Sequence, residues 1–298
     1  MDELKKKIEE EANLGLELCK KGKLEEGIKH LRFAAEHNYL EAIVNLGHAL
    51  KLADQYYEAF EWTLRGAELG DATAMSNLAI MYRRGQGCDC NVDEAVKWGK
   101  KIIEKGDIDG GYQEIICSYL YAVDNYQRDF EKAFKYALEG SKKVMAKNPN
   151  PKRGDVCESV IQLALCYNFA KGCKKDEKEA LKYYRYCSKC GMPLAMYNAA
   201  CIYGYSEDES LRDIDKSIKL FQHAANLDYG DALYELGYLY HLGEKVDKDL
   251  ILAKRYYAHA IRLGNGESHN EDAITNLKEI DPEITDRVIS GKYVPLID

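Results

Sequence analysis

Ten cysteines are the most reactive side chains in this chain of 298 residues. Two cysteine pairs have a spacing typical of metal ligands, Cys88-x-Cys90 and Cys187-x-x-Cys190. Four thiolates bind zinc in a tetrahedral site, with each sulfur about 2.3 Å from the metal. Many cysteines also suit a disulfide-bonded secreted protein. The positions of these cysteines in the secondary structure determine whether zinc binding or disulfide formation is possible.

Sequence motifs of known enzymes do not occur in the chain. It has no G-x-S-x-G elbow, H-E-x-x-H motif, Walker loop or Ser-x-x-Lys pair. The stretch Gly85-Gln86-Gly87-Cys88 does not follow a strand pattern, so it is not a dinucleotide-binding fingerprint. Asp107-Ile108-Asp109-Gly110 lacks the further ligands and the closing glutamate of a calcium loop. We therefore predict no catalytic residue and no cofactor.

Residues 230–264 show most clearly which elements build the chain. Apolar and small residues recur there at helical spacing in two runs: Leu233, Leu236, Gly237 and Tyr240, then Leu250, Ala253, Tyr257 and Ala260. Each run is one face of an amphipathic helix. Gly264 follows the second run, where a left-handed helix cap favours glycine. Because neither helix can bury its apolar face alone, this pattern indicates a stacked repeat.

The two-helix pattern can be aligned seven times along the chain. The first helices share a pair of apolar or small residues: Leu14-Gly15, Leu46-Gly47, Leu78-Ala79, Ile115-Ile116, Leu163-Ala164, Ala199-Ala200 and Leu236-Gly237. The second helices share one small residue: Gly27, Ala59, Ala95, Ala133, Ala180, Ser217 and Ala253. Small residues at these positions allow two helix axes to approach closely.

We predict an all-α protein, a right-handed α-solenoid of about seven helix-turn-helix repeats with a C-terminal cap. The predicted repeats cover residues 8–39, 40–70, 71–106, 107–147, 155–191, 192–229 and 230–264. Residues 265–298 form the cap and tail, with a capping helix from Asp272 to Ile280 and an irregular end from Ser290. The proline-containing segment 147–154 is predicted to be a hinge or a protruding loop.

This arrangement argues against the zinc site. The two cysteine pairs fall in the third and fifth repeats, with the fourth between them. Neighbouring helices pack about 8–10 Å apart, so the thiolates are too distant to share one metal. Most cysteines occupy helical positions that other repeats fill with small apolar residues. We predict reduced thiols that pack as small hydrophobic groups, and no metal.

The repeats resemble the Sel-1-like repeat family, a relative of the tetratricopeptide repeat. The resemblance covers about residues 8–264 and is strongest in the seventh repeat, where Val246 and Asp249 match the family pattern. The third repeat carries Ala74, Leu78, Ala79, Tyr82, Gly85, Gly87, Ala95, Trp98 and Gly106, and the fifth carries Leu163, Tyr167, Gly172, Asp176, Ala180, Tyr183, Tyr184 and Gly191. A cysteine-rich branch of the family, with reported β-lactamase-like members, joins its two helices by disulfides. That branch's framework is not reproduced here, although a single bridge such as Cys166–Cys187 is left open.

The resemblance also implies a binding face. In such solenoids the first helices line the concave side, and the residue before the conserved pair projects inward. Here that residue is Asn13, Asn45, Asn77, Glu114, Gln162, Asn198 or Glu235. An asparagine amide can both donate to and accept from a peptide backbone, and the similar residue does so in tetratricopeptide domains. The alternative is that these residues belong to the packing of the repeat.

Charged and aromatic side chains flank these positions. His48 and the cations Lys20, Lys51, Arg83 and Arg84 form a predicted basic strip that suits an acidic segment or a C-terminal carboxylate. Solvated surface cations are the competing interpretation. Farther along, the neighbouring residues are aromatic: Tyr197, Tyr205, Tyr234 and Tyr238, with Phe169 nearby. We predict a groove that is basic and rich in amides at one end, and acidic and aromatic at the other.

Composition limits the class of partner. The formal net charge is −8, which disfavours nucleic acid as a partner. No secretory signal or membrane-spanning run is visible, so we expect a cytoplasmic protein without membrane insertion. The favoured function is a non-catalytic scaffold that binds a peptide or protein on its concave face. The alternatives are an enzyme-like or small-ligand-binding relative of the cysteine-rich branch, and a structural subunit of an assembly.

Overall fold

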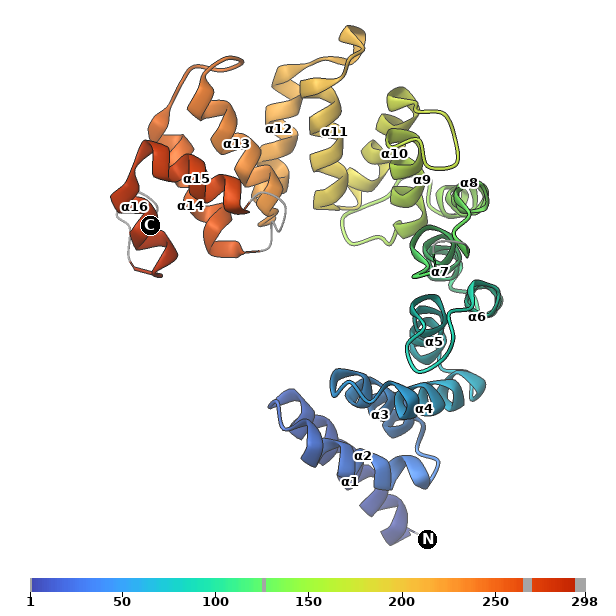
Figure 1. The fold of residues 1–298 in the computed structure, drawn as a ribbon. Coiled ribbons are helices and arrows are strands. Elements are labelled where there is room, and N and C mark those ends of the chain that lie inside the picture. The colour runs from blue at the N-terminus through green and yellow to red at the C-terminus, as the bar shows by residue number, and fades with distance from the viewer. Residues whose placement is uncertain (1, 125–126, 265–269, 293–298) are drawn as a thin grey trace. The chain divides into compact units, whose positions relative to one another are not determined.

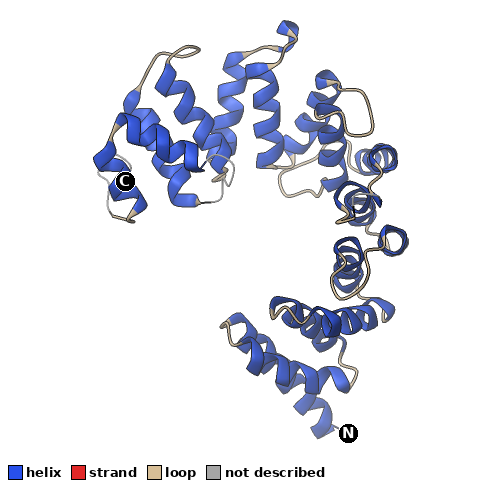
Figure 2. Cartoon of the chain, viewed as in Figure 1, coloured by secondary structure: helices blue, strands red, loops and turns tan. Residues whose placement is uncertain are grey.

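The computed structural model describes residues 2–124, 127–264 and 270–292. All regular structure in these ranges is helical, as Figure 2 shows. None of the helices found there is both long and apolar enough to cross a membrane. The chain divides into two compact units, which are described separately: unit 1 comprises residues 1–149 and 171–174, and unit 2 comprises residues 150–170 and 175–298.

Unit 1 consists of four consecutive helix pairs (Figure 1). Its helices are α1 (Asp2–Lys20), α2 (Leu24–Glu36), α3 (Leu40–Leu52), α4 (Tyr56–Glu68), α5 (Ala72–Arg84), α6 (Val92–Glu104), α7 (Ile108–Tyr121) and α8 (Phe130–Lys147). Each helix packs on the next, and the first helices of neighbouring pairs also meet, as α5 meets α7. The apolar faces predicted from the helical period are therefore buried within and between pairs.

Unit 2 continues with three pairs and two further helices (Figure 1). Its elements are α9 (Glu158–Asn168), α10 (Glu177–Lys189), α11 (Pro193–Tyr205), the 3₁₀ turn η2 (Glu209–Leu211), α12 (Ile214–Ala225), α13 (Gly230–Leu242), α14 (Leu250–Leu263), α15 (Asn270–Ile280) and α16 (Pro282–Ile289). Helices α15 and α16 both pack on α14. The sequence led us to expect a single helix after residue 264, so α16 was missed; residues 293–298 of the expected tail lie outside the described ranges.

The small residues aligned in the sequence lie where the two helices of a pair approach each other. A Cβ atom on Gly15 of α1 would lie 2.9 Å from the carbonyl oxygen of Gly27 in α2. In unit 2 the Ser217 hydroxyl of α12 donates a 2.8 Å hydrogen bond to the carbonyl of Ala200 in α11. Contacts this short require small side chains at Gly15 and Ser217.

A recurring backbone hydrogen bond fixes the start of the second helices. The N–H of the residue before these helices donates to a carbonyl in the last turn of the first helix, as Asp176 does to Tyr167 at 2.9 Å and Gln55 to Leu50 at 2.9 Å. In α10 the Asp176 side chain also caps the helix, because it accepts from the N–H of Glu179 at 2.9 Å. Gln55 makes no such side-chain bond to α4. The conserved-looking aspartate of the family pattern is therefore an N-cap residue.

We expect Asp176→Ala to lower the free energy of unfolding by about 1 kcal/mol, because an N-terminal N–H of α10 loses its acceptor. Gln55→Ala is the matched control at the same position of α4, and its effect should be much smaller. Urea unfolding followed by circular dichroism measures both. Equal losses in the two variants would show that the aspartate side chain does not stabilise the helix as a cap.

Two loop glycines are required by close backbone contacts. Gly87 and Gly172 both have a φ of 74°, in the left-handed region. A Cβ atom on Gly87 would lie 2.1 Å from the carbonyl oxygen of Tyr56, and one on Gly172 would lie 1.9 Å from that of Phe130. Each loop therefore packs against the first residue of a second helix in unit 1, a contact that only glycine permits.

Candidate functional site

Four of the polar residues singled out in the sequence lie close together in unit 1. The Lys51 ammonium of α3 donates a 3.3 Å hydrogen bond to the side-chain oxygen of Asn77 in α5. Burial lowers the pKa of Lys51, and the charge of Arg84 lowers it further. Burial likewise lowers the pKa of His48, with a second contribution from Lys51. His48, Lys51, Asn77 and Arg84 are therefore close neighbours, and we call them the basic patch.

Three other predicted residues of unit 1 lie outside this patch or have a different role. Asn13 on α1 is exposed, and Asn45 on α3 is half-buried. Arg83, by contrast, is only 8% exposed. Its charge acts on the carboxylate of Glu114 in α7. Burial raises the pKa of Glu114, and Arg83 and a hydrogen bond from Ser76 partly offset this increase. Arg83 is thus not the accessible groove cation that the sequence suggested, because α7 covers its side chain.

Two predicted amides of unit 2 are buried. Asn198 is 6% exposed, and its side-chain N–H donates to the carbonyl of Leu194 one turn earlier in α11 at 2.8 Å. Gln162 is 9% exposed, and its side-chain oxygen has no hydrogen-bond partner within the described ranges. Both side chains are too buried for a peptide to contact them in this structure. The row of accessible amides predicted from the sequence therefore does not include Gln162 and Asn198.

Two of the predicted aromatic residues of unit 2, Tyr205 and Tyr238, line a pocket of about 260 Å³. Tyr205 of α11 donates a 2.7 Å hydrogen bond to Glu235 of α13. The Lys245 ammonium lies 3.8 Å from the centre of the Tyr205 ring and donates to the Gly204 carbonyl at 2.9 Å. Tyr238 completes the aromatic wall. The pocket is lined by Tyr205, Tyr238, Leu239, Leu242, Glu244 and Lys245, and we call it the tyrosine pocket.

Tyr234 has a structural role beside this pocket. Its ring stacks on Tyr238 with centroids 6.1 Å apart, and Asn276 of α15 donates to its hydroxyl at 3.5 Å. Asn276 also donates to the buried Tyr257 at 3.4 Å. Helix α15 therefore helps to hold the ring next to the exposed Tyr238. Sequence periodicity did not identify Asn276 or the loop residue Lys245, because both come from outside the aligned first helices.

The cysteines of the described ranges form neither a disulfide nor a cluster of metal ligands. None of the ten forms a disulfide bond in the described structure, so the bridge Cys166–Cys187 is not present. No group of three or more potential metal ligands occurs among the residues with described positions. Burial is the main cause that raises the pKa of Cys88 to about 11 and that of Cys201 to about 12. These two thiols are protonated at neutral pH and are poor nucleophiles.

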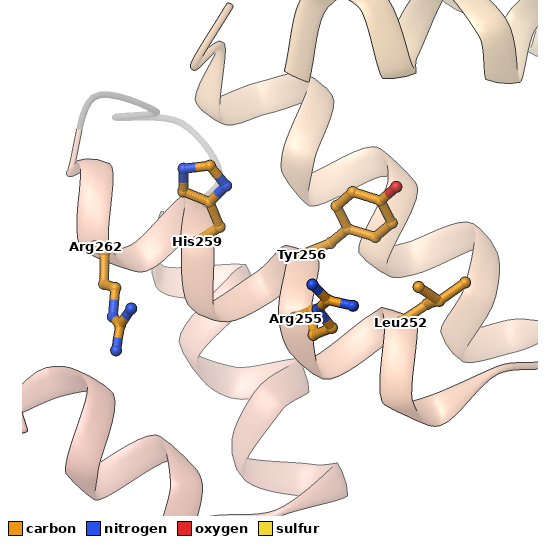
Figure 3. A pocket seen from close by; sticks show the side chains of 5 residues that line it. All are labelled: Leu252, Arg255, Tyr256, His259 and Arg262. Atoms are coloured by element: carbon orange, nitrogen blue, oxygen red, sulfur yellow. The ribbon is translucent and has the colours of Figure 1, made fainter. Parts of the chain in front are cut away.

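The second helices of unit 2 carry depressions that the sequence did not point to. Figure 3 shows one along α14, of about 360 Å³, where Leu252, Tyr256 and His259 lie on successive turns with Arg255 and Arg262. The imidazole of His259 is 3.2 Å from a carboxylate oxygen of Asp228. All five labelled residues come from one helix, so a single wall forms this depression.

These elements define an α-helical repeat protein built from consecutive helix pairs. The sequence pattern of the Sel1 repeat matches residues 41–71, 72–107, 117–143, 158–191, 193–229 and 230–265. These segments make up more than half of the sequence, and the chain belongs to the Sel1 repeat family. Proteins with such repeats generally mediate protein–protein interactions, and scaffolds of this fold are generally not enzymes.

Individual relatives match to different extents. Chitin synthase regulator SKT5 of Saccharomyces cerevisiae is 46% identical over 50 residues, which are 17% of this chain and 7% of that protein. The Sel1 repeat protein from Oxalobacter formigenes shares the fold with a TM-score of 0.57 and 23% identity, over 84% of this chain and 98% of that one. A tetratricopeptide repeat protein from Parabacteroides merdae matches with a TM-score of 0.47 and 12% identity, over 96% and 98%.

Proposed function

We propose that this protein is a non-catalytic scaffold whose first helices bind a peptide or protein partner, on the concave face of the predicted solenoid. The basic patch of unit 1 binds an acidic segment or a C-terminal carboxylate of that partner. The observation that carries this proposal is the convergence of Lys51 and Asn77 from adjacent first helices, with Arg84 and His48 beside them.

Electrostatics explains why the patch favours an anionic ligand. Lys51 and Arg84 repel each other, which is evident in the lowered pKa of Lys51 after the larger effect of burial. A carboxylate placed between the cations removes this repulsion and gains charge-assisted hydrogen bonds. Asn77 adds an amide that can bond to peptide backbone. The patch thus has groups for both the charge and the main chain of an acidic peptide.

The tyrosine pocket of unit 2 is the second contact region in this proposal. Tyr238 and Leu242 are 38% and 40% exposed, so an apolar side chain of a partner can cover them. Rigid aromatic residues of this kind often anchor protein interfaces. Lys245 and Glu244 give the pocket a charged rim. The two regions are proposed independently, and each can be tested without the other.

A charge-reversal experiment tests the basic patch. The probe is a fluorescein-labelled nonapeptide with several Asp and Glu residues and a free C-terminal carboxylate, measured by fluorescence anisotropy. We expect the double variant Lys51→Glu/Arg84→Glu to weaken binding by about tenfold or more, equivalent to about 1.4 kcal/mol. An amidated peptide and a peptide with lysine in place of the acids separate C-terminal recognition from side-chain recognition.

The control for this experiment is Lys29→Glu/Lys100→Glu. These two exposed lysines lie on second helices of the same unit, so the net charge changes equally while the patch is intact. An equal loss in both double variants would mean that only the overall charge matters. Failure of the wild-type protein to distinguish the acidic peptide from the lysine peptide would contradict the proposed ligand class.

Two observations support a non-catalytic role over the enzyme-like alternative. The high pKa values of Cys88 and Cys201 deprive these thiols of nucleophilic character. The partners of these four histidine side chains are not serine or cysteine: His30 contacts Glu11, His37 the Phe33 carbonyl, His241 Tyr257 and His259 Asp228. The matched yeast protein is named a regulator of chitin synthase, which is compatible with a protein that acts through a protein partner.

A further inference from the structure

A basic cleft lies between two second helices of unit 2, whereas the contact regions proposed above lie on first helices. Helices α10 and α12 form its walls, the turn at Ser210 and Leu211 forms its rim, and the buried Tyr203 of α11 contributes to its lining. Its volume is about 420 Å³. Neither the repeat pattern nor the proposed function of the first helices uses this cleft.

The cleft carries an excess of positive charge in an otherwise acidic protein. Its lining contains five cations, which are Lys178, Lys182, Arg185, Arg212 and Lys216. Only two carboxylates line it, from Glu179 and Asp213. The whole chain has a formal net charge of −8. A local excess of this kind within a negatively charged molecule indicates a site for an anion rather than a general attraction of polyanions.

The two carboxylates orient lysines and leave other cations unneutralised. Lys182 lies 3.4 Å from Glu179, and Lys216 lies 2.6 Å from Asp213. Arg212 is held at the rim, where its Nε donates to the Ser206 carbonyl at 2.6 Å and its guanidinium pairs with Glu209 at 3.4 Å. The cleft therefore presents cations whose positions are supported by hydrogen bonds, as a binding site for a fixed anion requires.

Arg185 and Lys178 supply the unneutralised charge. Within the described ranges, neither is in an ion pair of 4.0 Å or less. Lys178 acts on Asp208 only at longer range, as a minor contribution to the lowered pKa of that carboxyl. Asp213 raises the pKa of Lys216, and Arg185 opposes this shift, so Arg185 and Lys216 face each other as like charges. An anion between them would remove this repulsion.

Helix α10 differs from the other second helices in the positions of its cations. Counted from the aligned small residue Ala180, the three cations of α10 that line the cleft occupy positions −2, +2 and +5. The same positions of α6, counted from Ala95, hold Asp93, Lys97 and Lys100, and those of α14 hold Ile251, Arg255 and Ala258. Among the seven aligned second helices, only α10 has a cation at all three. The cleft is therefore a local departure from the repeat.

We propose that this cleft binds a phosphate monoester carried by a phosphorylated side chain of a partner protein. A phosphate dianion offers three acceptor oxygens and two negative charges, which match the guanidinium of Arg185 and the surrounding ammonium groups. A carboxylate is a weaker match, because two carboxylates already line the cleft and the positive excess persists. Leu181 and Leu211 provide apolar contacts for the chain that carries the phosphate.

The observations favour a phosphorylated protein over a nucleic acid or a membrane. The cations surround one depression and do not follow the long track that a nucleic acid backbone needs. The net charge of −8 repels an extended polyanion or an anionic bilayer at long range. At short range, salt screens that field within about 8 Å, so a single phosphate can still enter the cleft.

The test compares two double variants with the same change in charge. Lys182→Ala/Arg185→Ala removes two cations of the cleft. Lys97→Ala/Lys100→Ala removes the residues at the same positions of α6, where Lys97 pairs with Glu94 at 3.1 Å just as Lys182 pairs with Glu179. All four side chains are exposed, so both variants should fold, and circular dichroism verifies this. The probe is a degenerate nonapeptide library with a central phosphoserine, measured by fluorescence anisotropy at physiological ionic strength.

We expect the phosphoserine library to bind about tenfold or more tightly than the same library with serine or glutamate at the centre. Lys182→Ala/Arg185→Ala should abolish this preference, and Lys97→Ala/Lys100→Ala should preserve it. Equal binding of the three libraries, or an equal loss in both variants, overturns the proposal. It is also overturned if phosphatidylserine vesicles or single-stranded RNA bind through Lys182 and Arg185 while the phosphopeptides do not. The comparison is made in the Lys51→Glu/Arg84→Glu background, so that the basic patch of unit 1 does not contribute to the binding measured.

Discussion

Gly237→Leu is expected to destabilise unit 2 by about 3 kcal/mol, at the upper end of the usual cost of overpacking. A Cβ atom on Gly237 of α13 would lie 2.7 Å from a ring carbon of Tyr257 in α14. Tyr257 is fully buried, and its hydroxyl is held by Asn276 at 3.4 Å. Since the ring cannot move away without losing these contacts, the helices must separate. The measurement is urea unfolding followed by circular dichroism.

A double-mutant cycle identifies the cause of this loss. We expect Gly237→Ala to be destabilising in the wild-type background but harmless, or even stabilising, beside Tyr257→Leu. Removing the ring leaves only the gain of about 1 kcal/mol that alanine has over glycine within a helix. The same cost in both backgrounds would contradict a clash with Tyr257. Tyr238→Leu, at the exposed neighbouring residue, serves as the control and should change stability little.

Arg83→Met is expected to destabilise unit 1 by about 3 kcal/mol at neutral pH, because it leaves the Glu114 carboxylate without its compensating charge. The Arg83 side chain is 8% exposed, so water cannot readily replace it. Its backbone carbonyl accepts from the N–H of Val123 at 3.1 Å, a contact that the substitution keeps. Arg84→Met is the matched control on the exposed side of α5, and we expect it to be nearly neutral.

The loss caused by Arg83→Met should depend on pH in a defined direction. Burial raises the pKa of Glu114 above its ordinary value, and Arg83 lowers it in part, so the variant raises this pKa further. The folded state then binds this proton more tightly than the unfolded state. Protonation of Glu114 therefore stabilises the folded state fully at a pH below the pKa that Glu114 has in the unfolded chain. This stabilisation decreases as the pH rises toward the pKa of Glu114 in the folded state.

Urea unfolding on both sides of this range tests the linkage. We expect the difference between wild type and Arg83→Met to be small at about pH 4, where Glu114 is protonated in both, and large at neutral pH. Arg84→Met should show no comparable trend. A difference that does not change with pH would show that Arg83 stabilises unit 1 through packing and not through Glu114.

The candidate site shows how far residue types and spacing lead. His48 and Lys51 lie together because they are three residues apart on α3. Arg84 approaches Lys51 from the next first helix, α5. Asn77 joined them because the repeat register aligns neighbouring first helices. Arg83 was grouped with them by adjacency in sequence, yet one residue along a helix turns the side chain by about 100°. That rotation directs it toward α7 and away from the patch.

The cleft on the second helices illustrates the opposite case. Its three cations on α10 are visible in the alignment of the repeats, but Arg212 and Lys216 come from the turn and helix of the next repeat. No pattern within one repeat predicts that these groups line the same cleft. The signal that would have drawn attention to it is the run of cations at positions which other second helices fill with mixed residues.

Helical period and aligned small residues were sufficient to predict the helix pairs, because both depend on contacts within one pair. The N-cap aspartates follow from the same local chemistry, whereas Gly87 and Gly172 are required by contacts with the preceding repeat. The accessibility of each polar residue was decided only by the tertiary structure. Asn77 meets Lys51, Asn198 bonds to its own helix and Arg83 is covered. Equivalent positions differ because burial is set by side chains of adjacent repeats, and those side chains vary while the register does not.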